Sequence, residues 1–458
     1  MTSMPIIQHW NPEDRVFWDR SGRAVARRNL WLSIPALALA FAVWMLWSVV
    51  VVHLPAAGFR YSTNQLFWLT ALPALCGATL RIVYAFAVPV IGGRRFTTLA
   101  TASLLLPAIG IGLAVQDPTT PFEWMVVLAL LCGLGGGNFA SSMANISFFF
   151  PSARQGWALG LNAGLGHLGV ALVQLLVPLA ISAGAFGLLG GPAQPTAQGP
   201  MWLQNAGFIW VPLILASTLA AWFGMDDLSD RHAGMAQQAV IFTRRHNWLM
   251  CWLYLGTFGS FIGFAASLPM LAQSQFHRAD ALHLVWLGPL IGAVLRPLGG
   301  WMADLWGGAR VTLWIFVAMA LAATMALVCL PAVAGNGGQF AGFLAAFGVL
   351  FAASGIGNGS TFRMISSLFV AERQRHADSL PSAQAAAANE GAIEAAAALG
   401  FASAIGAYGG FFIPKSVGSS LAMTGSASAA LALFIVFYLS CIALTWWACS
   451  RRNAPYPC

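Results

Sequence analysis

The chain contains twelve apolar stretches, each long enough to cross a lipid bilayer as a helix. A helix needs about 20 mostly apolar residues to span the hydrocarbon core. Hydrophobic residues make up 59% of the chain and charged residues only 8%, too few to cover a water-soluble fold of this size. We therefore predict an all-α polytopic protein in a lipid bilayer. The expected spans are 29–54, 64–91, 96–115, 122–149, 156–184, 201–224, 247–272, 281–303, 311–334, 339–369, 389–413 and 421–449.

A charged linker divides these spans into two sets of six. Most of the 22 lysines and arginines lie in the tails, the linker and the even-numbered connections, whereas the odd-numbered connections hold Arg60, Arg278 and Lys415. By the positive-inside rule, both termini and the linker are expected to be cytoplasmic. We expect longer connections at 190–200 and 376–388. The predicted parts are an N-terminal tail at 1–28, a six-helix bundle at 29–225, the linker at 226–245, a second bundle at 246–449 and a C-terminal tail at 450–458.

The two halves repeat a sequence pattern. Arg81 is followed eleven residues later by Gly92-Gly93, and Arg296 is followed at the same distance by Gly307-Gly308, an offset of 215 residues. A second echo, at an offset of 220, relates Gly137-Asn138 to Gly357-Asn358. Parallel repeats of six spans are the layout of a major facilitator transporter, whose substrate binds near the middle of the membrane.

Arg81 and Arg296 lie deep within their expected spans, where a charge costs about 2.5–3.5 kcal/mol to insert. A buried arginine usually pairs with a carboxylate. All fourteen carboxylates, however, lie in a tail, in a connection or within a turn or two of the end of a span. We therefore expect the counter-charge to come from a dissolved anion.

The guanidinium group favours small planar oxyanions because its planar fork matches them with two parallel hydrogen bonds. Nitrate, nitrite or a carboxylate fits this description. Phe41, Phe139, Tyr254 and Phe258 are candidates for an apolar slot around the flat anion, although each aromatic residue taken alone is better explained by packing or by lipid contact.

Glycines crowd three of the expected spans, and small residues at this spacing let helices approach closely. We interpret most of them as packing residues. The mid-span asparagines Asn138, Asn145, Asn162 and Asn358 are candidate hydrogen-bond donors, either to a ligand or to neighbouring helices. The candidate substrate contacts in these spans are Asn162, Gly164, Gly357 and Asn358.

Four segments resemble the nitrate/nitrite porter family of the major facilitator superfamily: GLGGGNFASSMANISFFFP, QGWALGLNAGLGHLGV, GIGNGSTFRMISSLF and GFASAIGAYGGFFIPKSVG. The resemblance implies a transporter of nitrate and nitrite in the bacterial inner membrane, without a cofactor and functional as a monomer. It also implies that Arg81 and Arg296 are the paired substrate arginines. Phe41, Phe139, Tyr254 and Phe258 fall on the pocket positions of the family.

One residue departs from the family pattern. His167 stands where the family usually has an asparagine, which is a neutral donor. Histidine is either a neutral substitute or a titratable group beside the anion. Nearby arginines oppose its protonation, and a bound anion offsets that effect.

The expected mechanism is nitrate/nitrite antiport by alternating access. The alternatives are proton-coupled nitrate symport through His167 and, from a different class, an anion channel. An enzyme is not expected, because no nucleophile motif or phosphate loop occurs in a suitable setting, and the seven cysteines lack the spacing of a metal site. The net charge of +8 comes from singly scattered residues, so we predict no nucleic-acid partner.

Overall fold

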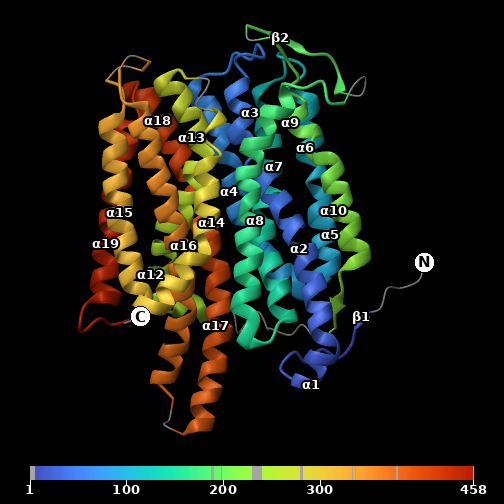
Figure 1. Cartoon of the computed structure of the whole chain (residues 1–458), viewed down its shortest axis with the longest axis vertical. Helices are drawn as coiled ribbons and strands as arrows, with labels where there is room; N and C mark the ends of the chain where they lie inside the picture. Colours follow the sequence, from blue (N-terminus) through green and yellow to red (C-terminus); the bar gives the residue numbers. More distant parts are fainter. Residues whose placement is uncertain are drawn as a thin grey trace. The chain divides into compact units, whose positions relative to one another are not determined.

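A computed structural model of the chain shows a protein built almost entirely of long helices (Figure 1). The structure describes residues 6–186, 190–197, 199–229, 240–278, 282–332, 334–335, 337–377 and 380–456. The chain divides into two compact units. The first comprises Met1–His232, Ala265–Gln273 and Arg278–Leu290, and the second comprises Ala233–Phe264, Ser274–His277 and Ile291–Cys458. The predicted bundle limits stay a prediction, and residues 230–239 of the predicted linker 226–245 lie outside the described residues.

Helices cover the first six expected spans. Their bounds are α1 Arg15–Phe17, η1 Trp18–Gly22, α2 Arg23–Trp44, α3 Trp47–His53, α4 Thr63–Ile91, α5 Gly93–Ser103, α6 Leu105–Ala114, α7 Phe122–Phe149, α8 Ser152–Ile181, α9 Asn205–Phe208 and α10 Trp210–Gly224. Several spans consist of two consecutive helices, as α2 and α3 do in the first.

The later part of the chain is also helical. Its elements are η3 Val240–Thr243, α12 Arg245–Tyr254, η4 Leu255–Gly259, α13 Ser260–Phe276, α14 Leu287–Trp306, α15 Gly308–Cys329, α16 Phe340–Arg375, α17 Pro381–Ala407, α18 Gly409–Thr424, α19 Ser428–Thr445 and η6 Trp446–Ser450.

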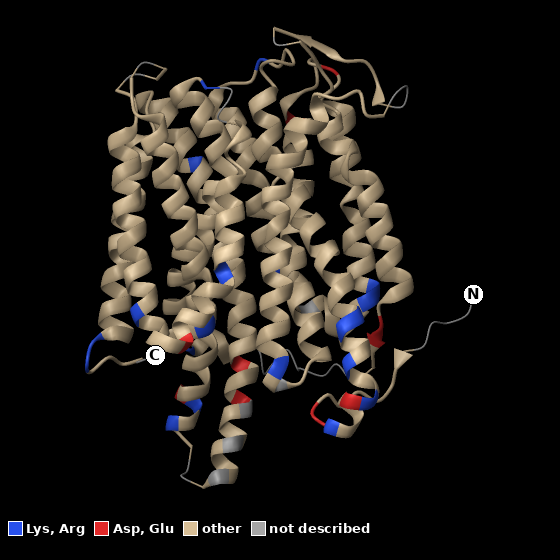
Figure 2. Ribbon diagram, viewed as in Figure 1, with Lys and Arg blue, Asp and Glu red and all other residues tan. Residues whose placement is uncertain are grey.

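Eleven helical stretches in the described part are long and apolar enough to cross a membrane, which confirms the predicted fold class. The expected span 281–303 is α14, which is helical but is not one of the eleven. Its 20 residues include the charged Arg296 and Asp304, and these reduce its apolar character. Figure 2 shows that most charged residues lie near the ends of helices rather than along their middles.

The expected connection at 376–388 is wrong for most of its length, because α17 begins at Pro381. Proline is favourable in the first turn of a helix, and the alanines that follow have the highest helix propensity of any residue.

The break expected between 413 and 421 is also absent. Helix α18 continues to Thr424 and ends at Gly425, whose φ of 71° lies in the left-handed region.

The N-terminal segment, predicted as a tail, is structured within the first unit. Strand β1 (Ile6–Ile7) pairs in parallel with β4 (Asp227–Leu228). The Trp10 ring packs edge-on against Phe149, with 5.4 Å between the ring centroids. A second strand pair, β2 (Gln194–Thr196) with β3 (Gly199–Met201), forms a hairpin in the expected connection at 190–200.

The repeated Gly-Gly pairs lie at equivalent turns in the two halves. Gly92 precedes α5 with φ of 111°, and Gly307 precedes α15 with φ of 86°. Both values lie in the positive range that glycine alone adopts readily. The next glycines, Gly93 and Gly308, leave no room for a Cβ atom against α7 and α16 respectively.

Helix α4 meets α7 through glycines, and α14 meets α16 in the same way. A Cβ atom on Gly77 would lie 2.9 Å from the Cα atom of Gly136. In the second half, a Cβ atom on Gly355 would lie 2.7 Å from the Cα atom of Gly292, and it would overlap the carbonyl oxygen of Gly292. Gly77 and Gly292 are separated by 215 residues, the offset between the two arginines, so the repeat extends to how the helices pack.

We expect Gly355→Ala to destabilise the protein by about 1–3 kcal/mol, because the added methyl group meets backbone atoms that cannot move aside. Gly348→Ala is the matched control, since Gly348 lies on the same helix and a Cβ atom there meets nothing within 4 Å. The melting temperature in detergent should fall by several degrees for Gly355→Ala and not for Gly348→Ala. Equal melting temperatures for the two variants would contradict the packing described here.

Candidate functional site

Arg81 lies on α4 and is fully buried in the first unit. Its Nε atom donates a hydrogen bond of 2.8 Å to the carbonyl oxygen of Gly136 on α7. This bond is possible because the glycines of the two helices let the backbones approach closely. The bond fixes the orientation of the guanidinium group within the bundle.

Aromatic rings cover the Arg81 guanidinium. Its carbon atom lies 5.1 Å from the centre of the Trp44 ring and 4.8 Å from that of Phe139, both distances within the range of cation–π interactions. The His167 ring packs 4.5 Å from Phe41 and 5.7 Å from Phe139. We call these five residues the Arg81 cluster. The sequence predicted four of them, and Trp44 was missed although it lies three residues after Phe41, on the same helix face.

Arg296 lies on α14 in the second unit and is 6% exposed. Its guanidinium carbon lies 5.6 Å from the centre of the Phe362 ring, and the Tyr254 hydroxyl lies beside the guanidinium. Tyr254 in turn packs against Phe258, with 5.6 Å between the ring centroids. We call these four residues the Arg296 cluster. Phe362 was missed, although it lies one helical turn after Asn358.

The candidate asparagines and glycines differ in their contacts with neighbouring helices. Asn162 donates a hydrogen bond of 2.8 Å to the Ser142 hydroxyl on α7. Asn358 is buried, and its Oδ1 atom accepts no hydrogen bond among the described residues. Gly164 is buried in α8. A Cβ atom on Gly357 would meet the side chains of Thr257 and Ile315, so this glycine lies in a helix–helix contact.

Arg363 is the third arginine within the expected spans, and from the sequence we interpret it as a helix charge on the cytoplasmic side rather than as a ligand. Its Nε atom contacts the Asp304 carboxylate of α14 at 2.5 Å, and both side chains are more than half exposed. Arg363 is therefore one of the arginines that form ion pairs with the carboxylates at the ends of the helices.

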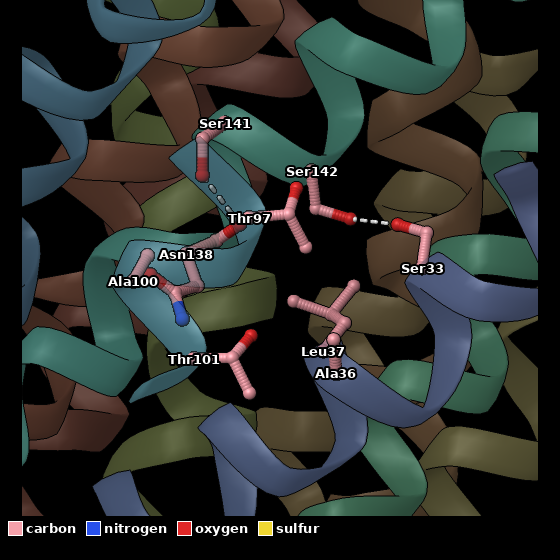
Figure 3. Close-up of a pocket in the computed structure, with 9 residues that line it drawn as sticks. All are labelled: Ser33, Ala36, Leu37, Thr97, Ala100, Thr101, Asn138, Ser141 and Ser142. Carbon is pink, nitrogen blue, oxygen red and sulfur yellow. Dashed lines mark hydrogen bonds between the residues drawn. The ribbon is translucent and has the colours of Figure 1, made fainter. Parts of the chain in front are cut away.

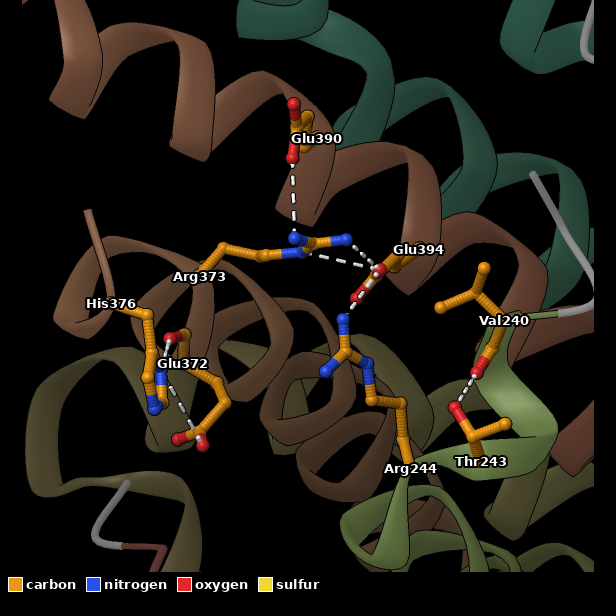
Figure 4. Close-up of polar contacts among 8 residues, drawn as sticks. All are labelled: Val240, Thr243, Arg244, Glu372, Arg373, His376, Glu390 and Glu394. Atoms are coloured by element: carbon orange, nitrogen blue, oxygen red, sulfur yellow. Dashed lines mark hydrogen bonds and ion pairs between the residues drawn. The ribbon is translucent and has the colours of Figure 1, made fainter.

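One group of these ion pairs connects α17 to α16 and to the start of α12, as Figure 4 shows. The Glu394 carboxylate accepts from Arg244 at 3.1 Å and from Arg373 at 2.5 Å. Arg373 also contacts Glu390 at 3.3 Å. Both glutamates lie within the expected span 389–413, and their contacts hold this part of α17 against α16.

A second set of ion pairs lies in the first unit. The Asp227 carboxylate accepts a hydrogen bond from the backbone N–H of Arg94 in the first turn of α5 and lies 3.4 Å from the Arg94 guanidinium. Asp226 pairs with Arg28 at 2.7 Å. These contacts fix the residues that follow α10 against the starts of α2 and α5. Within the described part of the chain, no three His, Cys, Asp or Glu side chains are grouped so that they could hold a metal ion.

The comparisons with known proteins agree with this architecture. Residues 32–377 match the model of the Major Facilitator Superfamily. The chain is 49% identical to the nitrate/nitrite transporter NarU of Escherichia coli, over 98% of this chain and 97% of that protein. It is 39% identical to the probable nitrate/nitrite antiporter NarK2 of Thermus thermophilus, over 99% of this chain and 98% of that protein.

A solved structure has the same fold. The crystal structure of a bacterial homolog of the human lysosomal transporter Spinster superposes with a TM-score of 0.62 and 13% sequence identity, covering 93% of this chain and 97% of the other. That likeness concerns the fold alone. The sequence matches extend over nearly the whole chain and include the motif segments, and they confirm the predicted transporter class. The chain belongs to the nitrate/nitrite porter family of the major facilitator superfamily.

Proposed function

We propose that this protein exchanges nitrate for nitrite across the bacterial inner membrane by alternating access, with Arg81 and Arg296 binding the anion. The observation that carries the proposal is a buried arginine at the same repeat position in each half, packed against aromatic rings in its own unit. The names of the relatives, a nitrate/nitrite transporter and a probable antiporter, support the choice of substrate.

The chemistry of the two clusters fits a small, flat, monovalent anion. A guanidinium can donate two parallel hydrogen bonds to a planar oxyanion, and its charge is permanent. The aromatic rings beside it offer few hydrogen bonds to replace a hydration shell, so strongly hydrated sulfate or phosphate would be disfavoured. Nitrate and nitrite are planar and weakly hydrated, and they meet both conditions.

Exchange rather than one-way transport follows from charge. Each guanidinium brings positive charge into an apolar environment, where its hydration is lost. A bound anion offsets that charge, so we propose that the loaded carrier changes conformation more readily than the empty one. We also propose that both termini face the cytoplasm, as the distribution of basic residues predicts, and that the monomer is the functional form.

We expect Arg81→Lys and Arg296→Lys each to lower kcat/KM for nitrate by about tenfold to hundredfold. Lysine keeps the charge but loses the two-point fork, and a hydrogen bond to a charged group contributes about 1.5–3 kcal/mol. Uptake of labelled nitrate into nitrite-loaded proteoliposomes measures the effect.

Arg363→Lys is the matched control for these variants. It changes the same side-chain type in an exposed ion pair with Asp304, where the interaction is weak, so transport should remain within about twofold of the original rate. Original rates in both of the other lysine variants would contradict anion binding by the paired arginines.

Exchange also predicts a dependence on the anion inside the vesicle. Nitrate should enter nitrite-loaded proteoliposomes quickly and enter vesicles without nitrate or nitrite at least about tenfold more slowly, since a barrier difference of about 1.4 kcal/mol gives that ratio. Liposomes without protein correct for leakage. Equal initial rates in loaded and unloaded vesicles would exclude obligatory exchange.

Proton-coupled nitrate symport is the second candidate, because His167 is a titratable side chain within the Arg81 cluster. Under exchange, nitrate uptake should leave the internal pH unchanged, and His167→Asn should retain the activity within a few-fold because asparagine keeps a neutral donor. A pH-sensitive dye inside the vesicles makes this measurement. Internal acidification that accompanies nitrate uptake in the original protein and disappears in His167→Asn would favour symport.

A further inference from the structure

A small polar cavity lies within the first unit, apart from the Arg81 cluster. Helices α2, α5 and α7 each contribute three lining residues, and most of their side chains carry hydroxyl or amide groups (Figure 3). The cavity has a volume of about 10 Å³. This is close to the minimum for one water molecule and too small for nitrate.

Two nearly buried polar atoms at this cavity lack partners among the described residues. They are the Thr101 hydroxyl oxygen on α5 and the Asn138 Oδ1 atom on α7. Thr101 is 1% exposed and Asn138 is 6% exposed. An unsatisfied polar group in such a place is unfavourable, so buried polar groups normally bind protein or ordered water.

A pair of serine hydroxyl groups that lines the cavity has one O–H hydrogen available to donate. The hydroxyl oxygens of Ser33 on α2 and Ser142 on α7 are 2.8 Å apart, so one of these groups donates to the other. Ser142 also accepts from Asn162. Whichever serine donates, the pair retains one O–H hydrogen for which the structure gives no acceptor, and both residues line the cavity.

These groups match the bonding capacity of one water molecule. Such a water would donate to Asn138 Oδ1, bond to the Thr101 hydroxyl and accept from the serine pair, which gives three of the four hydrogen bonds that a buried water can make. Its partners lie on three different helices. A bound water would therefore join α2, α5 and α7 at this point.

At the equivalent positions of the second half, the described residues are arranged differently. At the repeat offset of 215, Thr101 corresponds to Phe316 and Thr97 corresponds to Thr312. Phe316 is fully buried, and the Thr312 hydroxyl bonds directly to the Ser360 hydroxyl at 2.8 Å. The hydroxyl that Thr101 presents to the cavity thus has an aromatic ring as its counterpart.

We propose that the cavity binds one structural water that bridges Thr101, Asn138 and the Ser33–Ser142 pair. The water holds α5 and α2 against α7 one residue away from Phe139, which packs on Arg81. Asn138 and Thr101 are accordingly water ligands rather than contacts of the transported anion. The site does not depend on which anion the protein carries.

The variant Thr101→Val distinguishes a hydrated cavity from a dry one by the sign of its effect. Valine has the shape of threonine without the hydroxyl group. In a dry cavity, the substitution removes an unsatisfied polar group, so the melting temperature rises or stays the same. In a cavity with a bound water, the substitution removes a hydrogen bond, so the melting temperature falls by a few degrees. We expect the fall in the full-length protein in detergent.

Thr98→Val is the matched control. Thr98 lies on the same helix, and its hydroxyl bonds to the Arg94 carbonyl oxygen of its own helix at 2.9 Å. Thr98 is not a lining residue of the cavity. We expect Thr98→Val to change the melting temperature less than Thr101→Val does, and an equal fall in both variants would overturn the proposal.

A direct observation completes the test. A high-resolution structure of the original protein should show one density peak within hydrogen-bonding distance of both Asn138 Oδ1 and the Thr101 hydroxyl, and Asn138→Leu should remove it. In a double-mutant cycle, Thr101→Val and Asn138→Leu should be non-additive because both act through the same water. A cavity without such a peak, or additive effects, would overturn the proposal.

Discussion

The packing of each arginine-bearing helix against a glycine-rich helix is the constraint on which the rest of the structure depends. Within a membrane, every buried polar group must be satisfied by protein rather than by bulk water. The Arg81 Nε atom reaches the Gly136 carbonyl only because Gly77 and Gly136 let α4 and α7 come together. In the second half, a Cβ atom on Gly359 would overlap the Arg296 carbonyl oxygen. The glycines and the arginines are therefore one structural feature.

The two halves share this feature but differ around it. The turn before α5 and the turn before α15 use glycines with positive φ at equivalent positions. The Asp304–Arg363 ion pair, by contrast, has no counterpart, because the repeat offsets of 215 and 220 place Pro89 and Met143 there. In the first unit, Asp227 of β4 instead contacts the start of α5. The repeat thus preserves the close helix packing more strictly than it preserves the ion pairs at the helix ends.

The sequence predicted what depends on composition and spacing. The spans follow from the length of the apolar stretches, and the equivalence of Arg81 and Arg296 follows from the repeat. The sequence also predicted most members of the two clusters, because Phe41 and Phe139 are aromatic residues suited to flank a flat anion and His167 departs from the family pattern. Side-chain partners within those spans were less predictable. Asn162 and Gly357 contact neighbouring helices, and a helical pattern alone does not show which neighbour a residue faces.

Other features depended on tertiary contacts. The N-terminal segment was expected to be a tail because it is polar, but its few aromatic residues are enough to pack it against Phe149, and β1 adds a strand pair with β4. The start of α17 could have been predicted from its alanines and from Pro381. Glu390 and Glu394 lie within the expected span 389–413, but helical spacing alone does not show that they pair with Arg373.

The contacts described for the two arginines differ in kind, although the arginines occupy equivalent positions of the repeat. Arg81 is fixed by a backbone carbonyl and covered by the rings of Trp44 and Phe139. Arg296 lies beside the Tyr254 hydroxyl and against the ring of Phe362. The contacts described for Arg81 therefore include the backbone of α7, whereas those described for Arg296 are made by side chains, so the two halves position equivalent arginines through different groups.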